Sequence, residues 1–366
     1  MQKMPVISKV SPADYAELAA FLADFPDDRS KSAASWRSRM RAWWDLNPAY
    51  ADGVTRGWLL RHDGKIVGFF GSIPWQFQLD GAEATVFAGT TWRVLAEHRG
   101  MSMTLKRHQM DEHRDALHFS TTPRPEVARM LQLLGYKPIA RGPDGGDHGA
   151  IILNFRKVLR LKLQGRFPGT VLAACLAPVL RAVQSFRIRR LKHYGQGNIR
   201  ELCNANEAFD ELWNRTRTKY SNTHVRTAEA VNWYCFSSKE TKKNLFGYFD
   251  GDRLLGYMIC MPTERRGMTF FECVDLWLDT SPDNQDQDDV LGALVEKARQ
   301  CAVKSSFDRV FLPHFDHDIA ASLQRIGVPA MRAMERPEFF KGPRNVMETI
   351  TAENSYFVLA EGDYGL

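Results

Sequence analysis

One stretch of the sequence, residues 90–109 (TTWRVLAEHRGMSMTLKRHQ), has the residue types and spacing of an anion-binding turn. An apolar, β-branched run up to Leu95 breaks at residues 97–100 and continues as a helix-compatible run, which predicts a strand, a tight turn and a helix start. The first turn of a helix presents unpaired N–H groups and the positive end of the helix dipole, so it can hold a phosphate. Arg99 adds a forked cation beside Gly100, which lets the backbone approach closely.

Two carboxylates form a second set of candidate groups. Glu272 and Asp275 lie inside a strongly apolar run, residues 269–278. A carboxylate in such a strand costs free energy unless it is paired or lies in a cleft, and burial raises its pKa toward the range of a general base. Residues three apart on a strand face opposite sides, so we expect at most one of them to face a cleft. Glu272 is the candidate base, and Asp275 is a candidate substrate contact.

The run HFDHD at residues 314–318 follows the next predicted strand. Two His and two Asp in five residues could bind a metal, but no distant partner is identified, and capping of the following helix explains the pattern as well. The six cysteines are scattered without a C-x-x-C spacing, so they indicate neither a zinc site nor a disulfide framework. His314 is a candidate substrate contact, and we expect no metal site.

Charge is distributed unevenly along the chain. The net charge is +6, yet the segment from His148 to Arg200 contains 11 Lys and Arg and no Asp or Glu, so the rest is net negative. Its apolar centre, residues 167–180, is interrupted by two prolines, and we expect it to be too short to span a bilayer. An apolar stretch between cations suits an anionic membrane surface or a lipid-linked substrate. A helical hairpin packed on the protein itself explains it as well, and nucleic acid is an unlikely partner without interleaved aromatics.

The rest of the chain supplies the elements that would position these residues. Two hairpin signals, Asp63-Gly64 and Asp250-Gly251, lie inside similar strand pairs, residues 58–77 and 245–262. Farther along, LQLLGY at residue 131 matches LQRIGV at residue 323. This regular spacing predicts two copies of one α+β unit, each with two helices, a hairpin, and then strand, helix, strand, helix and strand. The last strands are expected at residues 150–156 and 356–360.

Residues 99–104 resemble the acyl-CoA pyrophosphate loop of the GNAT acyltransferases, which reads Arg or Gln, two residues, Gly, one residue, and Gly or Ala. Arg99 holds the first position, whereas Ser102 and Thr104 stand where the small residues belong. The order of elements is similar to the GNAT fold in both halves. The resemblance implies an α+β protein of two GNAT-like domains, each a mixed, mostly antiparallel sheet flanked by helices, with acetyl-CoA or another acyl-CoA as co-substrate. The cofactor-binding residues that it implies are Leu95, Arg99, Gly100, Met101, Ser102, Met103 and Thr104.

The reaction implied by the resemblance is attack of a neutral amine on the thioester carbonyl. It needs a base for the ammonium proton, donors for the oxyanion and an acid for the thiolate. Many GNAT enzymes use a Tyr as the acid, and this chain has Leu131 at that position. The hydroxyls of Ser120 and Thr121 are the expected substitutes, although they could instead cap the following helix. Thr90 and Thr91 should face alternate sides of their strand, so that one points into the cleft.

The two halves differ at the start of the helix that follows the fourth strand. The second half has an Asp-rich run at residues 279–289. Aspartates cap a helix and suit its dipole, but they repel a pyrophosphate. We therefore expect only the first half to bind CoA. A Ca²⁺ loop is the alternative, although the Gly and the terminal Glu of an EF-hand are absent.

These patterns predict an acyl-CoA-binding domain at residues 1–155, a basic linker at 156–200 and a degenerate second domain at 201–366. The N-terminus, MQKMPVISKV, lacks the apolar core of a signal peptide. We expect a cytoplasmic protein, peripheral to the inner face of the membrane if the linker binds lipid. The predicted function is transfer of an acetyl or other acyl group from acyl-CoA to a primary amine, such as an amino sugar in envelope or exopolysaccharide assembly. The alternatives are a Fem-like aminoacyltransferase with a lipid-linked acceptor and a non-catalytic membrane-surface protein.

Overall fold

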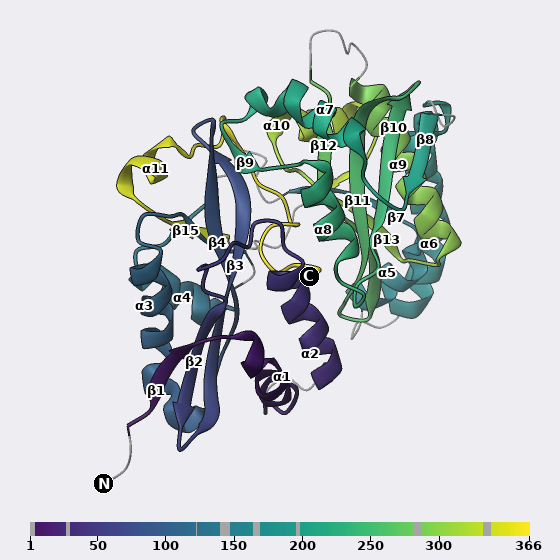
Figure 1. Cartoon of the computed structure of the whole chain (residues 1–366). Coiled ribbons are helices and arrows are strands. Elements are labelled where there is room, and N and C mark those ends of the chain that lie inside the picture. Colours follow the sequence, from purple (N-terminus) through teal and green to yellow (C-terminus); the bar gives the residue numbers. More distant parts are fainter. Residues whose placement is uncertain are drawn as a thin grey trace.

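A computed structural model of the chain describes residues 4–26, 30–121, 123–139, 147–163, 169–194, 198–280, 287–331 and 338–366. Within these residues two mixed sheets are flanked by helices, and the C-terminus lies between them (Figure 1). In spatial order the first sheet consists of β1 (Val6–Lys9), β2 (Gly57–His62), β3 (Lys65–Leu79), β4 (Ala82–Val94), β5 (His118–Ser120), β15 (Phe339–Lys341) and β6 (Lys137–Pro138), while β9 (Asn222–His224) pairs with β3, and β16 (Ser355–Tyr356) with β9. The second consists of β14 (Ala330–Met331), β7 (His148–Ile152), β13 (Arg309–Pro313), β12 (Met268–Leu278), β11 (Arg253–Arg265), β10 (Asn244–Asp250) and β8 (Ile199–Leu202). The predicted fold class is confirmed.

The helices lie close to their predicted positions. Asp316 caps one of them, since its side chain accepts a hydrogen bond from the Ile319 N–H at 2.7 Å, and this confirms the capping explanation of the HFDHD run. The α-helices are α1 (Tyr15–Ala23), α2 (Ala33–Met40), α3 (Ser102–Glu112), α4 (Pro125–Leu133), α5 (Phe155–Lys162), α6 (Gly169–Arg187), α7 (Glu207–Thr216), α8 (Ala228–Phe236), α9 (Gln287–Lys304), α10 (His317–Arg325) and α11 (Arg344–Thr349).

Both predicted hairpins form at their Asp-Gly turns. β2 pairs antiparallel with β3 around Asp63 and Gly64, whose φ angles are 49° and 78°. β10 pairs antiparallel with β11 around Gly251, whose φ is 60°. Glycine suits these positive φ angles because it has no Cβ, and Asp tolerates them better than most residues.

The two halves of the chain exchange strands between the sheets. β7 comes from the first half of the chain but pairs antiparallel with β13 in the second sheet. β15 comes from the second half but pairs with β5 and β6 in the first sheet. The expectation of a last strand at residues 356–360 was wrong, because only Ser355 and Tyr356 are extended there and they join the first sheet through β9. The predicted domain boundaries stay a prediction, and strand pairing crosses them.

The hydrophobic core is continuous through both halves. One cluster of buried side chains includes residues of α1, α2 and β3 together with residues of α8, β11 and α9. At the junction, the rings of Trp75 and Trp233 contact each other edge to face at 4.8 Å, and Trp233 Nε1 donates to the carbonyl oxygen of Ala42 at 2.6 Å. A buried indole N–H needs such an acceptor. These contacts fix the halves against each other.

The basic segment contains a longer apolar helix than its sequence suggested. Pro178 lies inside α6 without ending it. The helical stretch Val171–His193 is 23 residues long, its most apolar 18-residue window has a mean hydropathy of 1.5, and by length and composition it is able to cross a membrane. The expectation that no apolar run approaches this length was therefore wrong. Only 6% of its most apolar window is buried.

Candidate functional site

The predicted phosphate turn connects β4 to α3, and the structure has the predicted order of strand, turn and helix. A 3-10 turn, Ala96–Met101, runs directly into α3. The His98 N–H donates to the Leu95 carbonyl at 2.9 Å, and the Ser102 N–H donates to the Arg99 carbonyl. The amide end of this composite helix is therefore at residues 96–97, before Arg99 and Gly100, which are exposed. Of the remaining predicted cofactor residues, Leu95, Met101, Ser102, Met103 and Thr104 are half-buried along the same segment.

β4 carries a bulge directly before this turn. Its register against β3 shifts between Phe69 and Gly71, which leaves one extra residue on β4, and Thr91 has a φ of +48°. A bulge of this kind redirects side chains and is common beside functional sites. The oxygens Thr90 Oγ1 and Thr91 Oγ1 lie 3.0 Å apart. The expectation that these two side chains face opposite sides was therefore wrong, because strand alternation does not hold through a bulge.

The parallel pairing of β4 with β5 ends shortly before this bulge. Their parallel pairing comprises Phe87 with His118 and Ala88 with Phe119, while β4 continues for six more residues beyond Ala88. β5 ends at Ser120, which is half-buried, and Thr121 follows at 7% exposure. The hydroxyls predicted as donors therefore lie where the pairing of β4 and β5 ends.

The last residues of the chain lie beside Thr90 and Thr121, where the pairing of β4 and β5 ends. The hydroxyl of Thr90 donates to Asp363 Oδ2 at 2.6 Å. Gly362 has a φ of +82°, and a Cβ there would lie 2.5 Å from Thr121 Oγ1, so only glycine allows this close approach. A hydroxyl of β4 thus meets the Asp363 carboxylate, and Thr121, directly after β5, lies against the neighbouring Gly362. The sequence analysis missed Asp363 because nothing in the primary structure places residue 363 beside residue 90.

A buried lysine that the sequence analysis also missed lies on α3. Lys106 Nζ donates to Gln109 Oε1 at 2.7 Å, and Gln109 Nε2 donates to Ser72 Oγ at 3.0 Å. The rings of Phe70 and Tyr136 lie 4.7 and 4.8 Å from Nζ. Burial, with a smaller repulsion from Lys341, lowers the pKa of Lys106 from 10.5 to about 7.

A Lys106→Met variant should change how stability depends on pH. Between pH 7 and 9 the unfolded wild type keeps a proton on Lys106 that the folded protein releases, so its free energy of unfolding should rise with pH. Methionine removes this difference. We expect the stability of wild type relative to the variant to rise by about 2 kcal/mol over these two pH units, measured by urea unfolding at several pH values. Lys65→Met, which replaces an exposed lysine, is the control, and parallel pH profiles for wild type and Lys106→Met would contradict the prediction.

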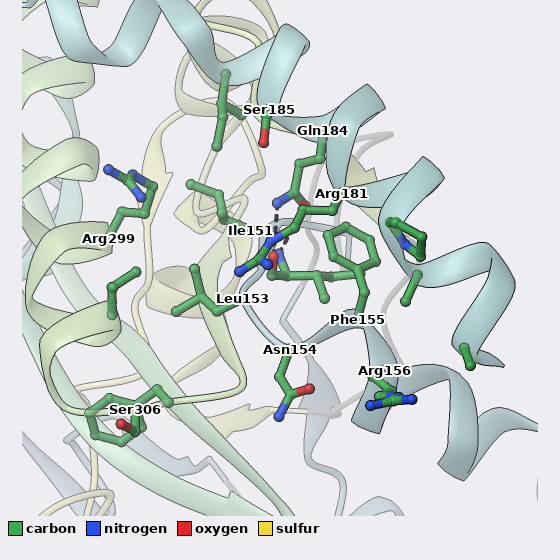
Figure 2. A pocket seen from close by; sticks show the side chains of 17 residues that line it. Ile151, Leu153, Asn154, Phe155, Arg156, Arg181, Gln184, Ser185, Arg299 and Ser306 are labelled. Atoms are coloured by element: carbon green, nitrogen blue, oxygen red, sulfur yellow. Dashed lines mark hydrogen bonds between the residues drawn. The ribbon is translucent and has the colours of Figure 1, made fainter. Parts of the chain in front are cut away.

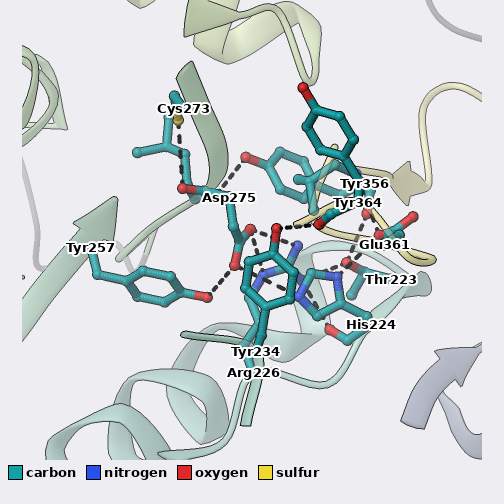
Figure 3. Close-up of polar contacts among 12 residues, drawn as sticks. Thr223, His224, Arg226, Tyr234, Tyr257, Cys273, Asp275, Tyr356, Glu361 and Tyr364 are labelled. Atoms are coloured by element: carbon teal, nitrogen blue, oxygen red, sulfur yellow. Dashed lines mark hydrogen bonds and ion pairs between the residues drawn. The ribbon is translucent and has the colours of Figure 1, made fainter. Parts of the chain in front are cut away.

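Two candidate residues of the second half, Glu272 and Asp275, are buried among polar groups, and Figure 3 shows those around Asp275. Glu272 is fully buried, and Arg265 and Tyr364 both donate to its Oε2, the latter at 2.5 Å. These donors stabilise the charged carboxylate and so oppose the effect of burial on which its predicted role as a base rested. The Tyr364 carbonyl accepts from Tyr234 Oη at 2.8 Å. Glu272 is therefore tied to the same C-terminal residues that reach Thr90.

Asp275 bridges the two sheets through Arg226. Arg226 Nη1 donates to Thr223 Oγ1 at 2.6 Å on the first sheet, while its Nε and Nη2 lie 3.3 Å from Asp275 Oδ1 on the second. Burial alone would raise the pKa of Asp275, but the charge of Arg226 and the hydrogen bonds from His224 and Tyr257 hold it well below its usual value. The expectation of a raised pKa was therefore wrong for Asp275.

The predicted alternation of Glu272 and Asp275 fails for the same reason as that of the two threonines. The register of β12 against β11 shifts between Ile259 and Cys260, which leaves Val274 without a paired residue. His314 directly follows β13, where it is 4% exposed and its N–H donates to the Asp147 carbonyl. The structure connects Glu272 and Asp275 with the C-terminal residues through Tyr364 and through His224 and Glu361.

No protein-family model matches this sequence, and no curated protein matches it either. Solved structures do match. A GCN5-related N-acetyltransferase from Anabaena variabilis is 12% identical, with 92% of this chain and 72% of that chain covered, at a TM-score of 0.56. A probable N-acyltransferase from Enterococcus faecalis is 10% identical, with 93% and 73% covered, at 0.57. N-myristoyltransferase from Saccharomyces cerevisiae with bound myristoyl-CoA is 10% identical, with 93% and 82% covered, at 0.51.

The chain has the GNAT fold. These identities are low, so the likeness concerns the arrangement of helices and strands and not individual residues. The position at which the resemblance placed the catalytic Tyr is taken by Leu131, which is 1% exposed and packs with Tyr136 and Phe339 in a small apolar cluster.

The acidic helix start of the second half lies only partly within the described residues. Residues 281–286 lie outside them. Asp279 is fully buried and forms ion pairs with Arg215 and Arg253, both at 3.1 Å. Asp288 pairs with Arg325 at 2.7 Å. Both aspartates thus have structural partners, and whether this half of the GNAT fold binds CoA stays a prediction.

Proposed function

We propose that the protein transfers an acyl group from acyl-CoA to a primary amine. The observation that carries this proposal is the place in a GNAT fold where the pairing of β4 and β5 ends, with a bulge at Thr91, a helix start after β4, and the Thr90 hydroxyl donating to the Asp363 carboxylate. Acyl transfer needs an anion site, oxyanion donors and a base within reach of one another. The N-myristoyltransferase that shares the fold holds myristoyl-CoA, which supports acyl-CoA as the co-substrate.

In the proposed reaction the Asp363 carboxylate takes the proton of the bound ammonium group. The neutral nitrogen then forms a bond to the thioester carbonyl carbon, the C–S bond breaks, and the nitrogen gives up its second proton to the leaving thiolate, so that the products are an amide and the CoA thiol. Thr91 Oγ1 lies 3.0 Å from Thr90 Oγ1, which donates to this carboxylate, and Thr121 lies against Gly362. Both hydroxyls are candidate donors to the oxyanion of the tetrahedral intermediate. Glu272 and Ser120 stay candidates for the base and for a further donor.

The acceptor that we propose is a primary amine, such as that of an amino sugar. A lipid-linked amine is the second candidate, favoured by the exposed apolar helix α6. We also propose, from the internal repeat, that the chain consists of two copies of one GNAT unit, of which only the first binds acyl-CoA. Asp275 has a structural role in the network with Arg226, and a substrate contact by Asp275 or His314 stays a prediction.

An Arg99→Glu variant tests the cofactor site. Arg99 is exposed at the turn before α3, so the substitution should replace an attraction for the pyrophosphate by a repulsion without disturbing the core. We expect the dissociation constant for acyl-CoA to rise roughly 10- to 100-fold. Calorimetric titrations with acetyl-, octanoyl- and palmitoyl-CoA measure it, and release of free CoA thiol in the presence of an amine panel measures transfer.

Arg344→Glu is the matched control, because Arg344 has a side chain that is 91% exposed and lies on α11. It changes the net charge by the same amount and should leave acyl-CoA affinity within about twofold. If wild type binds none of the three thioesters at millimolar concentration, the proposed function is wrong. If both variants weaken binding equally, Arg99 is not at the phosphate site.

A further inference from the structure

α6 exposes a row of large apolar side chains. They recur every three or four residues, which places them along one side of the helix. Leu172, Leu176, Val179, Val183 and Phe186 are 47%, 41%, 59%, 49% and 66% exposed. Contiguous apolar surface of this kind is rare on a protein that meets only water, because each side chain loses the free energy that burial would provide.

The opposite side of α6 is held to the protein by few contacts. Gln184 accepts a hydrogen bond from the Ile152 N–H at 2.9 Å and donates to the Ile152 carbonyl at 2.8 Å, and Ala173 is buried. Beside these contacts lies a cavity of about 650 Å³ between α6, α5 and α9, into which Arg181 and Arg299 project (Figure 2). The helix is therefore fixed to the body on one side and is uncovered on the other.

The surroundings of this apolar row are cationic. From His148 to Arg200, the segment that includes α5 and α6, there is no Asp or Glu. Arg160 and Lys162 on α5, with Arg187 and Arg190 at the end of α6, are exposed. The Arg189 guanidinium lies over the ring of Phe186 at 4.4 Å. Apolar side chains rimmed by cations match the acyl boundary and the phosphates of an anionic bilayer.

The fold excludes that α6 crosses a membrane and allows it only to lie along the surface of one. β7 precedes α5, and β8 follows the turn after α6, yet both strands belong to the second sheet. A crossing would place them on opposite sides of a bilayer, which would split this sheet. A helix parallel to the surface leaves the sheet intact and puts the uncovered side of α6 toward the lipid.

We propose that α5 and α6 form a docking surface for an anionic phospholipid bilayer, with the apolar row of α6 inserted at the acyl boundary and the flanking cations at the phosphates. The helix then anchors the protein peripherally. This inference rests on the exposed side chains and on charge, and it is independent of the proposed acyl transfer. An enzyme without membrane affinity and a membrane-bound protein without transferase activity are distinguishable results.

Co-sedimentation with vesicles of phosphatidylcholine and phosphatidylglycerol (7:3) tests the proposal, with pure phosphatidylcholine vesicles for comparison. Wild type should bind the anionic vesicles and release them as NaCl is raised from 50 to 500 mM. A variant with Val179→Ser, Val183→Ser and Phe186→Ser removes apolar groups and keeps every charge. A second variant with Arg160→Gln, Arg187→Gln and Arg190→Gln removes charge only. Each should bind at least about 10-fold more weakly.

The control variant carries Val6→Ser, Leu46→Ser and Leu133→Ser, which replace side chains that are 64%, 48% and 86% exposed in the first half of the chain. It should bind as wild type does. Circular dichroism establishes that the variants are folded. The proposal is overturned if folded wild type does not bind the anionic vesicles, or if the α6 serine variant binds them unchanged. It is also overturned if light scattering shows that wild type is a dimer and the α6 serine variant a monomer, and wild type does not bind vesicles. A second copy of the chain would then cover α6.

Discussion

An Arg226→Met variant should lose about 3–5 kcal/mol of unfolding free energy. Arg226 is 1% exposed and joins Thr223 on the first sheet to Asp275 on the second, with its guanidinium 4.2 Å from the Trp277 ring. Methionine fills much of the space but leaves the Asp275 carboxylate buried without its arginine partner, while Tyr257 still donates to it and His224 lies 3.6 Å away. Urea unfolding followed by tryptophan fluorescence measures the change.

Two further variants show whether the loss comes from the uncompensated carboxylate. Arg344→Met removes an exposed ion pair with Glu348 and should cost less than about 0.5 kcal/mol. The double variant Arg226→Met, Asp275→Leu removes both buried charges and should recover part of the stability. A loss below about 1 kcal/mol in Arg226→Met would contradict a central role for this bridge.

Replacing Asp363 by asparagine should reduce kcat roughly 100- to 1,000-fold while acyl-CoA affinity stays within about twofold. Asparagine keeps the shape of the side chain and an oxygen that can accept from the Thr90 hydroxyl, which now donates at 2.6 Å. It cannot accept a proton at neutral pH. The thiol-release assay with the best amine of the panel measures kcat.

Glu353→Gln is the control, since Glu353 is an exposed carboxylate near the same end of the chain. It should leave kcat and its pH dependence unchanged. Equal rates in wild type and Asp363→Asn would show that another group, of which Glu272 is the first candidate, takes the proton. An equal fall in acyl-CoA affinity and kcat would indicate that the end of the chain only shapes the cleft.

Local features of the fold could be predicted from the sequence because local interactions determine them. The Asp-Gly turns, the helices and the strand–turn–helix at residues 90–109 depend on hydrophobic period and turn chemistry. The positions of β7 and β15 could not be predicted, since a strand does not encode in its own residues which of two similar sheet edges it joins. β9 and β16, each two or three residues long, give too short a pattern to recognise.

The candidate site was predictable only in part, and the reasons are physical. Thr90 and Thr121 were found because they lie at the ends of recognisable strands. Their orientation could not be found, because the bulge at Thr91 interrupts the alternation that a strand pattern assumes. The roles of Asp363 and Lys106 depend on contacts between distant segments. The sequence does not distinguish a charged residue that is buried by such contacts from one that is exposed.

The exchange of β7 and β15 has a consequence for biosynthesis. As the chain leaves the ribosome, β5 can pair with β4, but its other neighbour, β15 (Phe339–Lys341), is among the last strands to be translated. The apolar edge of β5 around Phe119 is therefore unpaired until then. In turn β7 is made early and has no partner until β13 and β14 appear. The first sheet therefore cannot be finished before the second half is synthesised. A gene cut anywhere between β7 and β14 encodes two fragments that must associate before either sheet is whole.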